Sequence, residues 1–174
     1  ISAAFISNQI ADENNGQDNQ KLFLIGKHIS SEKGKSIVKI LLIIGGSISI
    51  IANWVTAIPA MCIYFLWGIE YNHPPFEWKN APTAGWFVNS CVGVLLFIIG
   101  WMLGMKNYPN NAIIPLSFDT FSHMLPYLLC FSAVSLLITL PYMKSDDSDM
   151  STFSVLFGFS TSIVISLLMV CMAF

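Results

Sequence analysis

The sequence contains no arginine and few charged residues of any kind. Charged residues make up 10% of its 174 residues, which is less than half the share that soluble domains usually carry. All eight basic residues are lysines, and ten acidic residues bring the formal net charge to −2. This composition excludes a soluble globular domain, a disordered chain and a nucleic-acid-binding protein. The lack of arginine also excludes bidentate clamps for phosphate or carboxylate groups.

The sequence also lacks the motifs of common catalytic and metal sites. It has no CxxC or HExxH spacing, no phosphate-binding loop and no glycine fingerprint for a dinucleotide. Its four cysteines fall one in each apolar stretch, which is typical of small buried residues rather than of a disulfide framework. We therefore expect no cofactor.

Hydrophobic residues make up 55% of the sequence, and they gather in four long stretches without charge. Each stretch is long enough to cross the roughly 30 Å hydrocarbon core of a bilayer as a helix of about 20 residues. A helix also satisfies the backbone polar groups within the segment, as lipid requires. The stretches cover residues 40–69, 84–105, 124–143 and 151–174. The sequence therefore predicts an all-α, polytopic integral membrane protein with four transmembrane helices.

The same pattern predicts two regions. Residues 1–35 form a polar N-terminal segment that is partly disordered or interfacial, and residues 36–174 form a four-helix transmembrane domain. The first apolar stretch is too long for one perpendicular span, since 30 helical residues would reach roughly 45 Å. Pro59 should kink or end its helix. We therefore predict one span over 40–58 with a tilted or interfacial extension, because two spans do not fit.

The placement of the lysines predicts the orientation. Five of the eight lysines precede the first apolar stretch, and the positive-inside rule puts such a segment on the cytoplasmic or matrix-like side. Residues 70–83 would then lie on the opposite, outer side. Trp101 and Tyr127 would belong to the aromatic belt at the inner interface. A bacterial inner membrane and an organellar inner membrane both fit this pattern.

Small residues spaced by four predict where the helices pack closely, because association in lipid depends on close approach of the backbones. We expect such packing along three rows of residues: Gly45, Ser49, Asn53 and Ala57; Gly100 and Gly104; and Ser154, Gly158, Ser162 and Ser166. The alternative is that the first and last rows line a polar path. Asn53 should form a hydrogen bond to another helix, or contact a substrate, a lipid headgroup or a partner subunit.

No charged residue lies in the middle of a predicted span, which argues against a proton-coupled pump or an ion-coupled transporter. Residues of types that suit a soft metal such as copper(I) gather near the inner interface. These residues are Met102, Met105, His123, Met124, Met169 and Met172. Methionine is more often an apolar filler of helix ends, so we predict no metal site.

These exclusions favour a small, non-enzymatic membrane protein that acts as a subunit or accessory factor of a larger assembly. Its partners would be membrane lipids and other integral membrane proteins, in a hetero-complex rather than a homo-oligomer, and no nucleic acid. Two alternatives stay open. One is a homo-oligomeric channel or carrier for a small uncharged solute, and the other is a membrane redox or metal-binding subunit.

Overall fold

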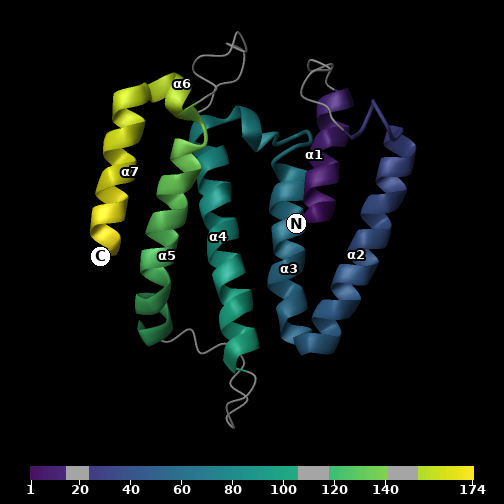
Figure 1. Ribbon diagram of the computed structural model, residues 1–174, viewed down its shortest axis with the longest axis horizontal. Coiled ribbons are helices and arrows are strands. Elements are labelled where there is room, and N and C mark those ends of the chain that lie inside the picture. Colours follow the sequence, from purple (N-terminus) through teal and green to yellow (C-terminus); the bar gives the residue numbers. More distant parts are fainter. Residues whose placement is uncertain (15–23, 106–117, 141–152) are drawn as a thin grey trace. The chain divides into compact units, whose positions relative to one another are not determined.

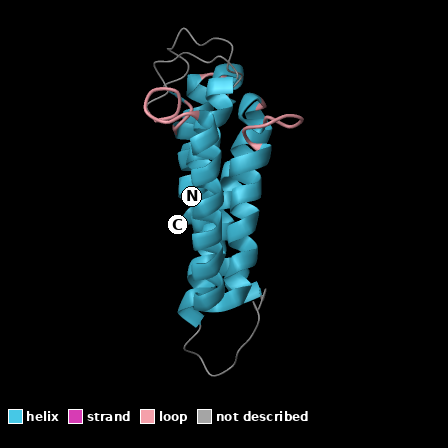
Figure 2. Ribbon diagram, turned by 90° about the vertical axis from the view of Figure 1, so that its right-hand side faces the viewer, coloured by secondary structure: helices cyan, strands magenta, loops and turns pink. Residues whose placement is uncertain are grey.

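The computed structural model describes residues 1–14, 24–105, 118–140 and 153–174 (Figure 1). Within these ranges the regular structure is helical (Figure 2). By length and composition, three described stretches could cross a membrane, namely Ser31–Glu70, Pro82–Gly104 and Phe118–Leu137, and a shorter apolar helix covers Phe159–Ala173. The predicted all-helical class is confirmed, and the number of spans stays a prediction.

The chain divides into two compact units, Ile1–Glu77 and Trp78–Phe174. Unit 1 contains a helical hairpin with a further helix packed against it. Its elements are α1 (Ser2–Asn14), α2 (Ser31–Asn53), the 3₁₀ turn η1 (Trp54–Thr56), α3 (Ala57–Ile63) and the π-helical segment η2 (Tyr64–Glu70).

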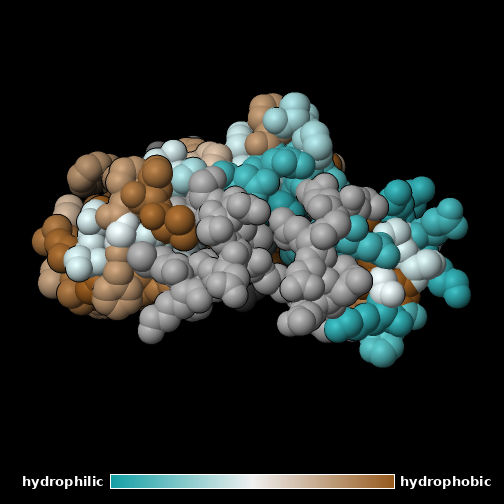
Figure 3. Space-filling view, turned by 90° about the horizontal axis from the view of Figure 1, so that it is seen from above, coloured by the Kyte–Doolittle hydropathy of each residue, from teal (hydrophilic) through white to brown (hydrophobic). Residues whose placement is uncertain are grey.

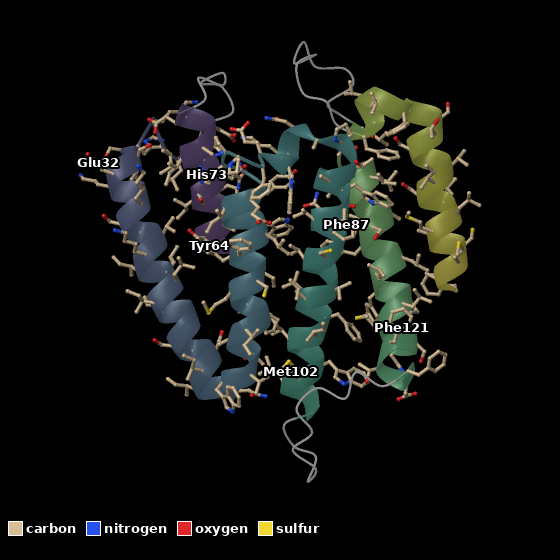
Figure 4. The ribbon with its side chains drawn as sticks, turned by 180° about the vertical axis from the view of Figure 1, so that it is seen from behind. Glu32, Tyr64, His73, Phe87, Met102 and Phe121 are labelled. Atoms are coloured by element: carbon tan, nitrogen blue, oxygen red, sulfur yellow. The ribbon has the colours of Figure 1, made fainter. Side chains whose placement is uncertain are left out.

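An apolar core joins α1 to the hairpin in unit 1. Its buried residues are Ala3, Ile6, Ile10, Ile25 and Val38. Tyr64, labelled in Figure 4, packs against this cluster from η2. A Cβ atom on Gly34 would lie 2.8 Å from Ile25 Cδ1, so the glycine permits close approach. Residues before 36 thus share a core with α2 and η2, and unit 1 ends at Glu77.

A polar turn reverses the chain between α2 and α3. Asn53 takes an extended conformation, with φ −164° and ψ 110°, and its Oδ1 accepts a hydrogen bond of 3.1 Å from the Val55 N–H. Thr56 Oγ1 donates to the Asn53 carbonyl at 2.7 Å. Pro59 lies in the first turn of α3, where its missing N–H removes no helical hydrogen bond. The helix is interrupted close to Pro59, but the Asn53–Thr56 turn forms the interruption, and Pro59 lies inside the next helix rather than ending one as predicted.

This reversal shows that the prediction of a single span over 40–58 is wrong. The helix already begins at Ser31, and α3 with η2 runs back along α2 (Figure 1). Both ends of the hairpin lie beside α1, where Ser7 Oγ donates to the Gly68 carbonyl at 2.6 Å. Residues 70–77 therefore follow at the same end of unit 1 as the start of α2, and their predicted placement on the opposite side is wrong.

Unit 2 is built around α5, which packs against both α4 and α7. The elements are η3 (Trp78–Asn80), α4 (Pro82–Met105), α5 (Phe118–Leu137), α6 (Phe153–Phe157) and α7 (Phe159–Ala173). The short helix α6 contacts α4 and α7, and the rings of Trp86 and Phe153 lie 5.8 Å apart. The third apolar helix, α5, begins at Phe118, earlier than the predicted residue 124, and ends at Leu137.

Gly158 divides the last apolar stretch into α6 and α7, so the prediction of one continuous helix over 151–174 is wrong. The glycine has φ +88° and ψ 160°, a backbone conformation that is essentially confined to glycine. Nothing in the described part of the chain lies within 4 Å of the position of a Cβ atom there. Gly158 thus serves a sharp bend, whereas the sequence predicted close helix packing.

We expect Gly158→Ala to lower the free energy of unfolding by about 1–3 kcal/mol, because an alanine would hold the same strained dihedral angles. Thermal unfolding of the purified protein in detergent measures the effect. Gly100→Ala is the matched control, since Gly100 is helical and also has open space at its Cβ position. Equal unfolding temperatures for the two variants would show that the bend places no demand on residue 158.

Candidate functional site

An apolar groove lies between α4 and α5 in unit 2. Its volume is about 790 Å³, within the range of roughly 300–1,000 Å³ that is usual for ligand sites. The lining residues are Gly93, Leu96, Phe97, Gly100, Trp101, Gly104, Tyr127, Cys130, Phe131 and Val134. None of these side chains carries a charge, so the groove suits an apolar ligand.

Aromatic rings form one wall of the groove. The Phe97 ring stacks on Trp101 with centroids 5.8 Å apart and lies 4.9 Å from the ring of Tyr127. Trp101 in turn contacts the His123 ring, with centroids 5.8 Å apart. Rings at these separations attract one another and resist displacement. The wall therefore offers a preformed, polarisable surface along which a hydrocarbon chain can lie.

The depth of the groove differs between the glycines of α4. At Gly93 a Cβ atom would lie 2.5 Å from Phe131 Cγ, so the Phe131 ring rests against the α4 backbone and restricts the groove at that end. Gly100 and Gly104 are exposed, and the described residues leave the space around a Cβ atom there empty within 4 Å. The groove is thus narrow at Gly93 and open toward Gly104, near the end of α4 that Met102 marks in Figure 4.

A buried network of hydroxyl groups lies beyond the narrow end of the groove. Ser132 Oγ of α5 donates to Ser90 Oγ of α4 at 2.8 Å. Ser90 Oγ donates to the Trp86 carbonyl at 3.0 Å, and the Trp86 indole N–H donates to the Ser132 carbonyl at 3.1 Å. These bonds tie α4 to α5 one helical turn from Gly93. A polar contact between α4 and α5 thus lies about one turn beyond the Gly93 end of the apolar groove.

The serines of the last predicted packing row are buried in unit 2. Ser154 and Ser162 have 0% exposure and Ser166 has 2%. Ser166 Oγ donates to the Ala133 carbonyl of α5 at 3.2 Å as well as to the Ser162 carbonyl at 2.8 Å. The neighbour of this face in unit 2 is thus α5.

The other predicted packing residues are placed differently. Gly45 is exposed, with no described atom within 4 Å of a Cβ position, and Ala57 is only half-buried at the start of α3. Asn53 holds the hairpin turn, and the Ser49 carbonyl accepts a hydrogen bond of 3.3 Å from Thr56 Oγ1. Gly100 and Gly104, which the sequence assigned to helix contacts, line the groove instead.

The residues of the soft-metal cluster considered above lie in different environments in the structure. Met102 and Met124 are buried, whereas Met172 is 73% exposed. Met169 is half-buried on α7, and the Met105 side chain lies outside the described residues. His123 contacts Trp101 and has its Nδ1 2.8 Å from the Asp119 carbonyl. No group of three or more His, Cys, Asp or Glu side chains in the described ranges is arranged to hold a metal ion.

Sequence reasoning missed the groove because each of its residues had a simpler explanation. Trp101 and Tyr127 were assigned to an aromatic belt, and the α4 glycines to packing. The available signal was the spacing of Gly93, Phe97, Gly100 and Gly104, which places them along one face of α4. Glycines that alternate with an aromatic residue on one helix face leave hollows beside a ring.

A sequence model of the UbiA prenyltransferase family matches residues 1–174, the whole chain. The chain therefore belongs to this family of integral membrane proteins. Comparisons with curated proteins and with solved structures found no match. The family corrects the functional prediction: a non-enzymatic accessory subunit is wrong, because the match indicates a membrane-embedded enzyme. The missing motifs did not exclude an enzyme, because they report only on the few reaction types that have well-known short sequence motifs.

Proposed function

Because the chain is a member of the UbiA prenyltransferase family, we propose that it is a membrane-embedded prenyltransferase whose α4–α5 groove holds the isoprenoid chain of the donor. The family match over the whole chain carries this proposal. The apolar, ring-lined groove supports it, since prenyl substrates are lipophilic and can enter from the membrane.

The reaction class sets what the groove must do. In prenyl transfer, the bond between the allylic carbon and its leaving group breaks, and the leaving group keeps the electron pair. The same carbon bonds to the acceptor, which loses a proton. Water would compete as an acceptor, so the site must keep the reacting chain dry. The uncharged lining between Gly93 and Gly104 performs this part of the task.

The polarity of the site orients the chain within it. The bonded hydroxyls of Ser90 and Ser132 lie beyond the narrow end, and the groove is apolar from there to Gly104. A donor has a polar leaving group at one end and a hydrocarbon tail at the other. The reacting end thus lies toward Ser90, and the tail runs toward Gly104.

A transfer assay tests the proposed function. The purified protein in lipid nanodiscs receives a radiolabelled isoprenoid diphosphate, together with a lipid extract that supplies acceptors. We expect a labelled lipophilic product that chromatography separates from the donor and that heat-denatured protein does not form. The absence of product with donors of every chain length, in protein that remains folded, would contradict a prenyltransferase.

We also infer that the end of unit 1 where α2 begins faces the cytoplasmic or matrix-like side of an inner membrane. Hydrophilic residues gather at this end (Figure 3). Exposed lysines contribute to it, namely Lys27, Lys33 and Lys35, and the positive-inside rule favours that side for them. The hairpin adds residues 70–77 to this end, and Lys79 follows two residues later.

Cysteine labelling in intact cells tests the orientation. Lys27→Cys and Lys79→Cys should resist a membrane-impermeant thiol reagent added outside, and Asp119→Cys at the start of α5 should react. The four native cysteines are first replaced by alanine, and permeabilised cells show that every position can react. Labelling of Lys27→Cys with protection of Asp119→Cys would reverse the orientation, and labelling of Lys27→Cys with protection of Lys79→Cys would refute the hairpin topology.

A further inference from the structure

We propose that Gly100 and Gly104 determine the longest isoprenoid chain that the groove accepts. This inference rests on the proposed function, because it takes the occupant of the groove to be the isoprenoid of the donor. It assigns to two glycines of α4 a role in specificity that helix packing does not explain.

The three groove glycines differ in what their missing side chains allow. Gly93 is explained by packing, since a Cβ atom there would lie 2.5 Å from Phe131 Cγ. Gly100 and Gly104 have no such neighbour: within the described ranges, nothing lies within 4 Å of a Cβ position at either residue. Both nevertheless line the groove. Their small size therefore enlarges the groove and does not serve the contact between α4 and α5.

The spacing of these glycines matches the repeat of an isoprenoid. From Gly93 to Gly104 the groove follows α4 for about 16 Å, at about 1.5 Å per residue. An isoprene unit adds four carbon–carbon bonds, which extend the chain by roughly 5 Å. Gly100 and Gly104 are one helical turn apart, about 6 Å. A bulky side chain at residue 100 should thus shorten the accepted chain by about one isoprene unit more than the same side chain at residue 104.

The open surroundings make this inference testable without unfolding the protein. Leucine favours helix over glycine, and no described atom lies within 4 Å of a Cβ position at residue 100 or 104. Gly45 of α2 provides a matched control, because it is an exposed helical glycine with equally empty surroundings and lies in unit 1. Gly45→Leu adds the same side chain far from the groove in sequence.

The test is competition against a short photoreactive probe, a two-unit isoprenoid diphosphate analogue, on the full chain in lipid nanodiscs. Unlabelled diphosphates with two, three and four isoprene units compete for labelling. We expect Gly104→Leu to weaken competition by the four-unit chain about tenfold, because the last unit loses its apolar contacts. Gly100→Leu should weaken both the four-unit and the three-unit chains. Competition by the two-unit chain should stay unchanged in both variants, and all three chains should compete normally with Gly45→Leu.

Equal weakening at every chain length in Gly104→Leu, or no weakening at any length, would overturn the inference. The absence of specific labelling of the unaltered protein would overturn it too, because the groove would then hold no isoprenoid. The transfer assay reports separately on the proposed function. A protein that shows the length-dependent competition but forms no product binds isoprenoids as inferred here without being a prenyltransferase.

Discussion

Gly93→Leu should lower the free energy of unfolding by about 3 kcal/mol or more, at the upper end of what overpacking costs. The Cβ atom alone would lie 2.5 Å from Phe131 Cγ and 3.0 Å from Phe131 Cβ. Rotation about the Phe131 Cα–Cβ bond can move Cγ, but Cβ is fixed to the backbone and cannot move without moving α5. The helices would therefore separate, and the hydrogen bond from Ser132 to Ser90 would lengthen or break.

Thermal unfolding in detergent measures this effect, with Gly100→Leu as the matched control on the same helix. The control should unfold near the temperature of the unaltered protein, because its Cβ position is open. Phe131→Ala should restore part of the stability that Gly93→Leu removes, and a double-mutant cycle quantifies that coupling. Identical unfolding temperatures for the two leucine variants would show that α4 and α5 do not meet at Gly93.

Ser7→Val should detach α1 from the hairpin and lower the stability of unit 1 by about 1–3 kcal/mol. Ser7 is 7% exposed, and its Oγ donates to the Gly68 carbonyl at 2.6 Å and lies 3.2 Å from His73 Nε2. Because the hydroxyl proton goes to the carbonyl, His73 is the donor in the second contact. Valine would remove the hydroxyl from both contacts and would leave the buried Gly68 carbonyl without this donor.

Limited proteolysis and thermal unfolding together measure the loss of this contact. Asn8→Ala is the control, because the Asn8 side chain donates a hydrogen bond within α1, to Asp12 at 3.1 Å, and it is less buried than Ser7. We expect cleavage within α1 to accelerate in Ser7→Val and to stay slow in Asn8→Ala. Equal cleavage rates would indicate that the apolar core of unit 1 holds α1 without Ser7.

Long apolar runs predicted the helical membrane class because hydropathy acts along the chain and can be read locally. The same reasoning failed at Asn53, where an amide in a continuous apolar run was read as a contact between helices. In the structure its Oδ1 accepts a hydrogen bond from the Val55 N–H two residues on. A turn made by such local side-chain bonds leaves no trace in hydropathy, so the hairpin could not be predicted.

The groove was hidden for a related reason. A glycine in an apolar helix can admit a neighbouring ring, as Gly93 does, or leave a space, as Gly104 does. Both residues are glycines in the same helix. The difference lies in which residue of the adjacent helix faces each of them. Phe131 of α5 faces Gly93, and only the arrangement of α4 and α5 shows it. The prenyltransferase family was not predicted either, because none of the short motifs considered in the sequence analysis belongs to it.

The central claim is that an isoprenoid chain lies between α4 and α5, and mapping the attachment site of a tail-labelled photoreactive isoprenoid tests it most directly. The full chain is labelled in lipid nanodiscs, and mass spectrometry identifies the modified residues with and without excess unlabelled isoprenoid diphosphate. We expect competable labelling on groove residues of both helices, including Phe97 and Tyr127, and none on α2 around Gly45. Labelling that excess competitor does not displace, or that falls equally on α2 and α4, would contradict the account.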